Sequence, residues 1–167
     1  MANTFELIAS STVGAGGASA ITFSSIPSTY TDLCLKMSLR LVADGDYGTM
    51  TINGSGSNFS SRRIYGDGSA ATSATRSDNY LIGVYNASGS TGNTFANLEI
   101  YFPNYAGSNN KSFSIDAVTE NNATSAVATL SANLWSNTPA INALSFLPYT
   151  SNFAQFSTAY LYGVKNA

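Results

Sequence analysis

Histidine is absent from this sequence, and cysteine occurs only once. Without histidine the chain lacks the most common general base, which is also a common metal ligand. The single cysteine, Cys34, excludes an internal disulfide, and a catalytic thiol at this position would have no histidine to activate it. The nine acidic residues are scattered, and no spacing selects two of them as an acid–base pair. We therefore expect a protein that is not an enzyme and that holds no cofactor.

Charged residues are also scarce. They make up 10% of the chain, compared with about 25% in typical globular proteins, and the net charge is −2. Of the seven lysines and arginines only Arg62 and Arg63 are adjacent, whereas binding of nucleic-acid phosphates requires clustered cations. The sequence therefore predicts no nucleic-acid partner, and we expect the arginine pair to lie on a solvated strand edge or loop.

Long apolar runs are missing as well. No segment approaches the ~18 consecutive apolar residues of a membrane-spanning helix, so we expect no membrane partner. The N-terminal residues MANTFELIASSTV lack the basic start and the continuous apolar run of a signal peptide. We expect production in the cytoplasm without a cleaved leader.

The sequence is rich in alternating apolar and polar residues. In residues 31–42 (TDLCLKMSLRLV) the alternation is strict. Side chains point to opposite faces along a β-strand, whereas a helix would scatter these apolar residues around its circumference. The segment therefore predicts a long antiparallel strand with one face on a core and one in water. The predicted core face consists of Leu33, Leu35, Met37, Leu39 and Leu41, and the opposite face of Asp32, Cys34, Lys36, Ser38 and Arg40.

Shorter segments of extended or alternating character follow along the chain, separated by turn residues. Short strands spaced about 10 to 15 residues apart are typical of an all-β sandwich or barrel, and no internal repeat is evident. We expect residues 1–167 to form a single all-β domain, a two-sheet, jelly-roll-like sandwich of roughly nine to ten antiparallel strands. The segments with strand character are residues 4–13, 20–23, 31–42, 49–53, 58–65, 80–85, 94–102, 111–120, 126–135, 141–147 and 156–164.

Three connecting segments carry more specific expectations. Residues 14–17 (GAGG) lie between the first two predicted strands, and glycine supplies the positive φ of tight turns, so we expect a β-hairpin there. Residues 66–79 (GDGSAATSATRSDN) are small and polar, and we expect a long loop. The turn with Asp44 and Asp46 is the best candidate for a bound calcium ion, although an ordinary hairpin turn explains the same residues.

Aromatic residues make up 12% of the chain, and several alternate with core-facing residues in residues 94–102 and 156–164. A strand that is apolar on both faces indicates one face on the core and the other against a partner subunit. A sugar-stacking site or a second core layer would explain the same pattern. Lys36 and Arg40 are two of only seven cations, which makes their strand face a further candidate contact surface. The candidate interface residues are Lys36, Arg40, Phe95, Tyr101, Tyr160 and Tyr162.

Both ends of the chain resemble small virion proteins of tailed bacteriophages. Residues 5–33 (FELIASSTVGAGGASAITFSSIPSTYTDL) are similar to the hydrophobic opening strand, glycine-rich hairpin and TYTDL corner of those proteins. Residues 160–165 (YLYGVK) resemble their terminal strand. The resemblance implies a structural β-domain of a virion, similar to head decoration (cement) proteins and to tail-fibre tips, both usually trimeric jelly rolls. It brings no catalytic residues.

Of these virion parts, a head decoration protein is the one we expect. The predicted strands run from about residue 4 to about residue 164, with no heptads and no stalk segment for attachment to a fibre. We expect a homotrimer on the capsid surface of the virion, bound to the major capsid protein and stabilising the assembled shell. A tail-fibre or carbohydrate-binding tip is the alternative. An enzyme such as a glycan depolymerase would require two carboxylates roughly 5–10 Å apart in a cleft.

Overall fold

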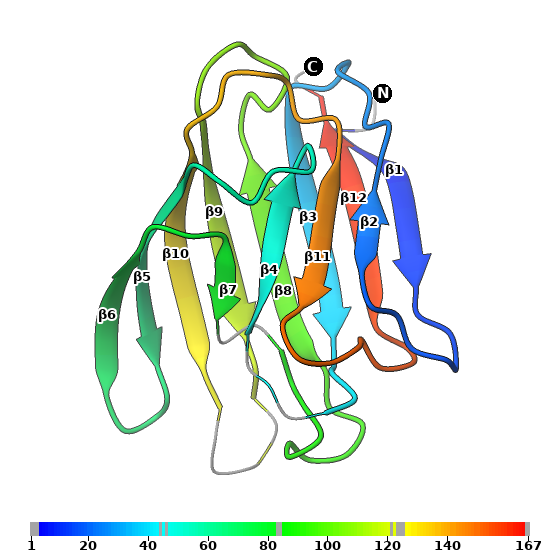
Figure 1. The fold of residues 1–167 in the computed structure, drawn as a ribbon, viewed down its shortest axis with the longest axis vertical. Helices are drawn as coiled ribbons and strands as arrows, with labels where there is room; N and C mark the ends of the chain where they lie inside the picture. Colours follow the sequence, from blue (N-terminus) through cyan, green and yellow to red (C-terminus); the bar gives the residue numbers. More distant parts are fainter. Residues whose placement is uncertain are drawn as a thin grey trace.

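The computed structural model describes residues 4–165, apart from residues 44, 46, 83, 84, 121 and 123–125. These residues form twelve β-strands in two sheets (Figure 1). The described part of the chain has no helix long and apolar enough to span a membrane. The strands are β1 (Phe5–Thr12), β2 (Ile21–Phe23), β3 (Asp32–Leu39), β4 (Tyr47–Ile52), β5 (Phe59–Gly66), β6 (Ala71–Arg76), β7 (Tyr80–Ile82), β8 (Ala96–Phe102), β9 (Lys111–Val118), β10 (Ala128–Trp135), β11 (Leu144–Pro148) and β12 (Thr158–Val164).

The larger sheet has the strand order β1-β12-β3-β8-β9-β10-β5-β6, and the smaller sheet has the order β2-β11-β4-β7. Every strand pair is antiparallel. Strands from the beginning of the chain pair with strands from its end: β1 pairs with β12, and β2 pairs with β11. β4 pairs with both β11 and β7. The expected two-sheet, all-β sandwich is confirmed, with twelve strands instead of nine to ten.

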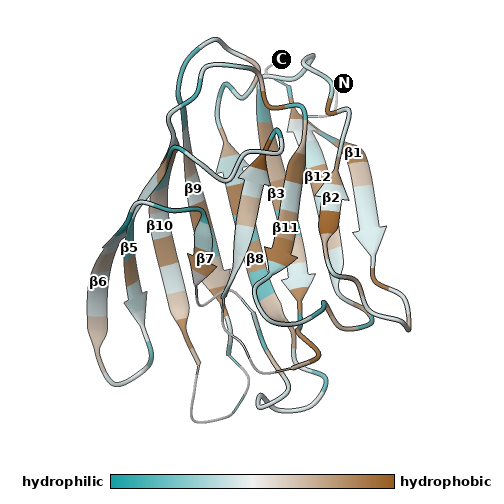
Figure 2. Ribbon diagram, viewed as in Figure 1, coloured by the Kyte–Doolittle hydropathy of each residue, from teal (hydrophilic) through white to brown (hydrophobic). Residues whose placement is uncertain are grey.

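β3 lies inside the larger sheet and follows the predicted alternation. Leu33, Leu35 and Leu39 are fully buried and belong to the core between the sheets, whereas Lys36 is exposed. Figure 2 shows the same alternation as apolar bands along the strands. Because burial of one leucine side chain contributes about 1.5–3 kcal/mol, this strand fixes which face of the sheet is turned inward.

The smaller sheet covers only part of the larger one. In Figure 1 its four strands lie in front of the larger sheet, and β5 and β6 extend beyond them at the left. The larger sheet therefore has a covered end, formed by β12, β3 and β8, and a free end, where β5 and β6 extend beyond the smaller sheet. Its outer face, the side turned away from the smaller sheet, has no second layer of described strands over it at either end.

The expected hairpin between the first two strands is wrong. β1 pairs with β12 in the larger sheet, and β2 pairs with β11 in the smaller one, so residues 14–17 carry the chain from one sheet to the other. Gly17 has a φ of 70°, and a Cβ added there would meet the carbonyl oxygen of Phe153 at 2.9 Å. The glycine is needed for this crossing, because the next residue, Ala18, pairs with Phe153.

The expected long loop at residues 66–79 is also wrong, because its centre is β6. This strand pairs with β5 from Gly66↔Ala71 to Ser61↔Arg76. In the turn, Asp67 Oδ1 accepts hydrogen bonds from the backbone N–H groups of Ser69 (2.9 Å) and Ala70 (3.0 Å). Gly68 adopts a φ of 88°. Small polar residues form a strand here because it is the last strand of the sheet and buries little side-chain surface.

Candidate interaction surface

Four of the predicted interface residues lie together on the outer face of the larger sheet. β12, β3 and β8 are neighbours, and their register places Tyr160 opposite Lys36 and places Tyr162 and Tyr101 on either side of Cys34. Their core-facing neighbours, such as Leu35 and Leu161, point to the other side of the sheet and are fully buried. The alternation seen in the sequence therefore brings three strands that are distant along the chain to one surface.

Arg40 and Phe95 lie apart from this group. Arg40 follows the end of β3, and its guanidinium donates to the carbonyl oxygens of Thr94 (2.9 Å), Thr91 (3.0 Å) and Ser90 (3.3 Å). This arginine holds a loop in place. Phe95 precedes the first residue of β8 and is half-buried.

On the outer face, polar contacts hold Tyr101 and Lys36, and Cys34 between the two tyrosines is buried. The Tyr101 hydroxyl donates to Asp32 Oδ2 at 2.6 Å, and this bond, together with burial, raises the pKa of Tyr101 to about 12. Burial raises the pKa of the Cys34 thiol to about 11, so Cys34 stays protonated and unreactive at neutral pH. Lys36 forms an exposed ion pair with Glu99.

Large apolar side chains are exposed in two parts of the outer face, on β1 and β12 and on β9, β10 and β5. Phe5 lies edge-on to Tyr162, with ring centroids 6.4 Å apart, and Leu7 is the register partner of the same tyrosine. Leu130 of β10 is flanked by Asp116 and Ile64 on the neighbouring strands. The exposed side chains of this face have between 37% and 59% of their surface accessible. They are Phe5, Leu7, Ile64, Val118, Leu130 and Tyr160.

The alternating apolar residues of β10 (Ala128, Leu130, Ala132 and Leu134) face outward, which the sequence did not indicate. In β10 the buried residues are Thr129, Ser131 and Trp135, whereas Leu130 is exposed. The polar inner side chains bond to one another, since Asn133 Nδ2 donates to Ser131 Oγ at 2.8 Å. The alternating pattern predicted the strand, but a pattern within one strand does not indicate which of its two faces the smaller sheet covers.

A groove of about 730 Å³ runs over the outer face between β8 and β6. Ile64 and Leu130 form its apolar floor, Tyr101 borders it at β8, and Ser73 lines it at β6. Residues from strands this far apart in the sheet order line a single hollow, so the sheet is concave on this side. A second hollow of about 310 Å³, also lined by Ile64 and Leu130, adjoins it.

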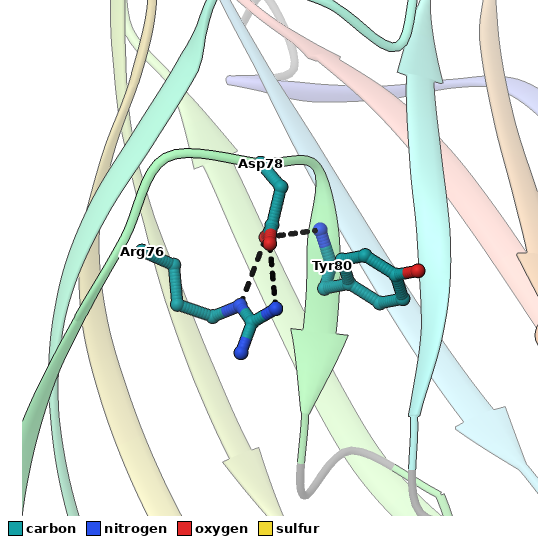
Figure 3. A network of polar contacts seen from close by, with 3 residues as sticks. All are labelled: Arg76, Asp78 and Tyr80. Carbon is teal, nitrogen blue, oxygen red and sulfur yellow. Dashed lines mark hydrogen bonds and ion pairs between the residues drawn. The ribbon is translucent and has the colours of Figure 1, made fainter.

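A separate tyrosine cluster lies on the outward surface of the smaller sheet. The ring centroids of Tyr47 and Tyr149 are 4.6 Å apart, and Tyr80 lies within 5.8 Å of both. The Arg76 guanidinium lies 5.0 Å from the Tyr80 ring centroid and pairs with both carboxylate oxygens of Asp78 (Figure 3). This pairing lowers the pKa of Asp78 and raises that of Arg76, so both groups stay charged at neutral pH.

Comparison of the chain with protein-family models, with curated protein sequences and with solved structures gave no match. The function therefore has to be inferred from the geometry of the surfaces themselves. Among the described residues no three acidic or cysteine side chains come together as a metal site. The calcium candidates Asp44 and Asp46 lie outside the described residues.

Proposed function

We propose that this chain is a non-enzymatic structural protein that assembles through the outer face of its larger sheet. The observation that carries the proposal is the set of exposed apolar side chains of that face, which form one group on β1 and β12 and a second group on β9, β10 and β5. Contiguous exposed apolar side chains on a protein surface mark an interaction site. Covering these side chains would contribute up to about 1.5–3 kcal/mol for each one that becomes fully buried.

The few charges on the outer face also favour a protein partner. Lys36 is paired with Glu99, Asp32 accepts a hydrogen bond from Tyr101, and the other charged side chains on the described strands of this face are Arg62 and Asp116. Depletion of charge with enrichment of aromatic residues is typical of the centre of a protein interface. Tyr160 and Tyr162 supply the aromatic component without a charge that would have to be desolvated.

The virion part that we propose is the surface of a bacteriophage head. The resemblance of residues 5–33 and 160–165 to phage virion proteins supports this location, and a concave outer face with few charges suits docking onto another protein. The chain would form a homotrimer bound to the major capsid protein. Because it would bind the assembled shell and not the free subunits, it would stabilise the shell by mass action.

A second candidate function is a carbohydrate- or receptor-binding tip of the phage tail. The tyrosine cluster of the smaller sheet favours it, since exposed aromatic rings next to charged hydrogen-bonding groups suit stacking on sugars. Tyr149 is 53% exposed and lies on the opposite side of the molecule from Tyr160. The two candidate functions therefore depend on different surfaces.

Two experiments together test both candidate functions. One is cryo-electron microscopy of the phage particle, and the other is re-addition of purified variants to particles that lack the protein. We expect density on the head, increased heat resistance of the particles on re-addition, and loss of binding for Tyr160→Ser, while Tyr149→Ser binds normally. Density at the tail, with loss of host adsorption for Tyr149→Ser only, would replace the first function with the second. Absence of the chain from the particle would contradict both.

A further inference from the structure

The outer edge of β6 ends the eight-stranded sheet with backbone groups that no other described strand pairs with. In the turn before it, the Asp67 N–H donates to the Ala70 carbonyl oxygen at 3.4 Å. Asp67 and Ala70 are therefore a hydrogen-bonded pair, and this determines which residue pairs of β5 and β6 are hydrogen-bonded. Hydrogen-bonded and non-hydrogen-bonded pairs alternate in an antiparallel ladder. The N–H and C=O groups of Thr72 and Ala74 therefore face β5, and those of Ala71, Ser73 and Thr75 point away from the sheet.

The other sheet edges are protected in the ways that folded proteins commonly use. β1, at the opposite end of the same sheet, has a register shift between Leu7 and Ala9, and its Glu6 pairs with Lys165 at 2.8 Å. The edge strands of the smaller sheet, β2 and β7, are three residues long. Bulges, charges and short length all discourage pairing with another chain.

β6 has none of these protections. It is six residues long, pairs regularly with β5, and carries no proline and no charge from Ala71 to Thr75. Its one charged residue, Arg76, is neutralised by Asp78, with Nε and Oδ1 2.8 Å apart (Figure 3). A regular, uncharged edge of this length is a template for a further strand.

We propose that β6 pairs antiparallel with β6 of a second copy of the chain, around a two-fold axis at Ser73. In this register Ser73 faces Ser73 of the other copy, and Ala71 of each copy faces Thr75 of the other. These are the residues whose N–H and C=O groups point outward, so the pairing satisfies all of them at once. No charged residue opposes a like charge, because Arg76 faces Ala70.

The outer face also favours a second copy of the chain as the partner that pairs with β6. Ser73 lies opposite Ile64, and both line the groove, which reaches the β6 edge through Ser73 and Thr75. Pairing around Ser73 would join the grooves of two copies and align their Ile64 side chains across two serines. Two-fold pairing of one surface with itself is the commonest arrangement of homo-oligomers.

This contact uses the backbone edge of β6, whereas the assembly proposed above uses side chains of the outer face. Tyr160 and Tyr162 lie on β12, next to β1, whereas β6 is at the other end of the sheet order. The pairing therefore does not depend on the virion function. It would join two outer-face assemblies of the protein through the β6 edge of one chain in each.

Cysteine cross-linking tests the register directly. Hydrogen-bonded residue pairs across an antiparallel ladder have Cα atoms about 5.5 Å apart, within the range of a disulfide. Oxidation of a Ser73→Cys variant should therefore give a covalent dimer as the main product. The native Cys34 is buried and should not react. Ser108→Cys, an exposed loop position, is the matched control and should stay predominantly uncross-linked.

A charge variant provides the second measurement. Ser73→Lys would place two lysines opposite each other at the axis, while the exposed side chain leaves folding unaffected. We expect the mass measured by light scattering to double with rising concentration for the wild type and for Ser108→Lys, but not for Ser73→Lys. Cross-linking of Ser73→Cys no greater than that of Ser108→Cys, or equal masses for Ser73→Lys and wild type, would overturn the pairing. Either result leaves the outer-face proposal intact, because Tyr160 is unchanged in these variants.

Discussion

The covered and free ends of the larger sheet have the same alternating pattern but different surroundings. At the covered end, Leu35 and Leu161 are fully buried beneath the smaller sheet. On the outer face, toward the free end, Ile64 and Leu130 are more than half exposed, and buried polar residues occupy the inner side of β10. The period of the pattern thus determines the strand, while the presence of a covering layer determines which face is core.

This difference has a consequence for the two faces of the molecule. Apolar side chains at the covered end contribute to the free energy of folding, since they leave water when the sheets pack. Those of the outer face remain in water in the single chain, so they contribute little to folding and are available for binding. We therefore expect substitutions in the core and on the outer face to separate stability from assembly.

The largest effect is expected from truncating a covered leucine. Leu35→Ala removes fully buried methyl groups and leaves a cavity, and should lower the free energy of unfolding by about 2–5 kcal/mol. Leu130→Ala, the matched change on the outer face, should lower it by less than about 1 kcal/mol. Urea denaturation measures both. Equal losses for the two variants would mean that Leu130 is as well covered as the core.

A smaller effect is expected from the turn that joins β5 and β6 at the free end. Hydrogen bonds from the Ser69 hydroxyl and from the backbone N–H groups of Ala70 and Ser69 lower the pKa of Asp67 from 3.8 to about 2. Because the folded protein favours the ionised carboxylate, the stabilisation is present above pH ~4 and is lost as the pH falls toward 2. The difference in melting temperature between wild type and Asp67→Asn should therefore shrink over that interval.

Thermal unfolding at a series of pH values checks this expectation. A melting-temperature difference that stays constant from pH ~6 down to pH ~2 would show that the Asp67 charge has no part in the turn. Because the carboxylate is fully exposed, salt should also reduce the difference.

The sequence was sufficient to predict the fold class and four interface candidates that lie on one surface. Strict alternation in β3 placed Lys36 on the outer face, and the same period in β8 and β12 placed Tyr101, Tyr160 and Tyr162 there. These residues could be found because their strands lie where the smaller sheet covers the opposite face. Their role in an interface remains a prediction.

Other features depend on tertiary packing that a local pattern does not contain. β6 was expected to be a loop, since a strand that buries little side-chain surface needs no apolar residues. The crossing at residues 14–17 has the glycine content of a hairpin, and only the distant partners β11 and β12 distinguish the two. Leu130 belongs to the groove because no described strand of the smaller sheet lies over that face.

Light scattering of the dilute protein tests the outer-face assembly most directly. It compares the mass of the wild type with that of a Leu7→Ser, Tyr160→Ser double variant. Both side chains are exposed on the outer face, so the double variant should still fold and keep the circular dichroism spectrum of the wild type. We expect the mass of a homotrimer for the wild type and the mass of a single chain for the variant. A wild type that is monomeric at every concentration, or a variant that keeps the wild-type mass, would contradict assembly through this face.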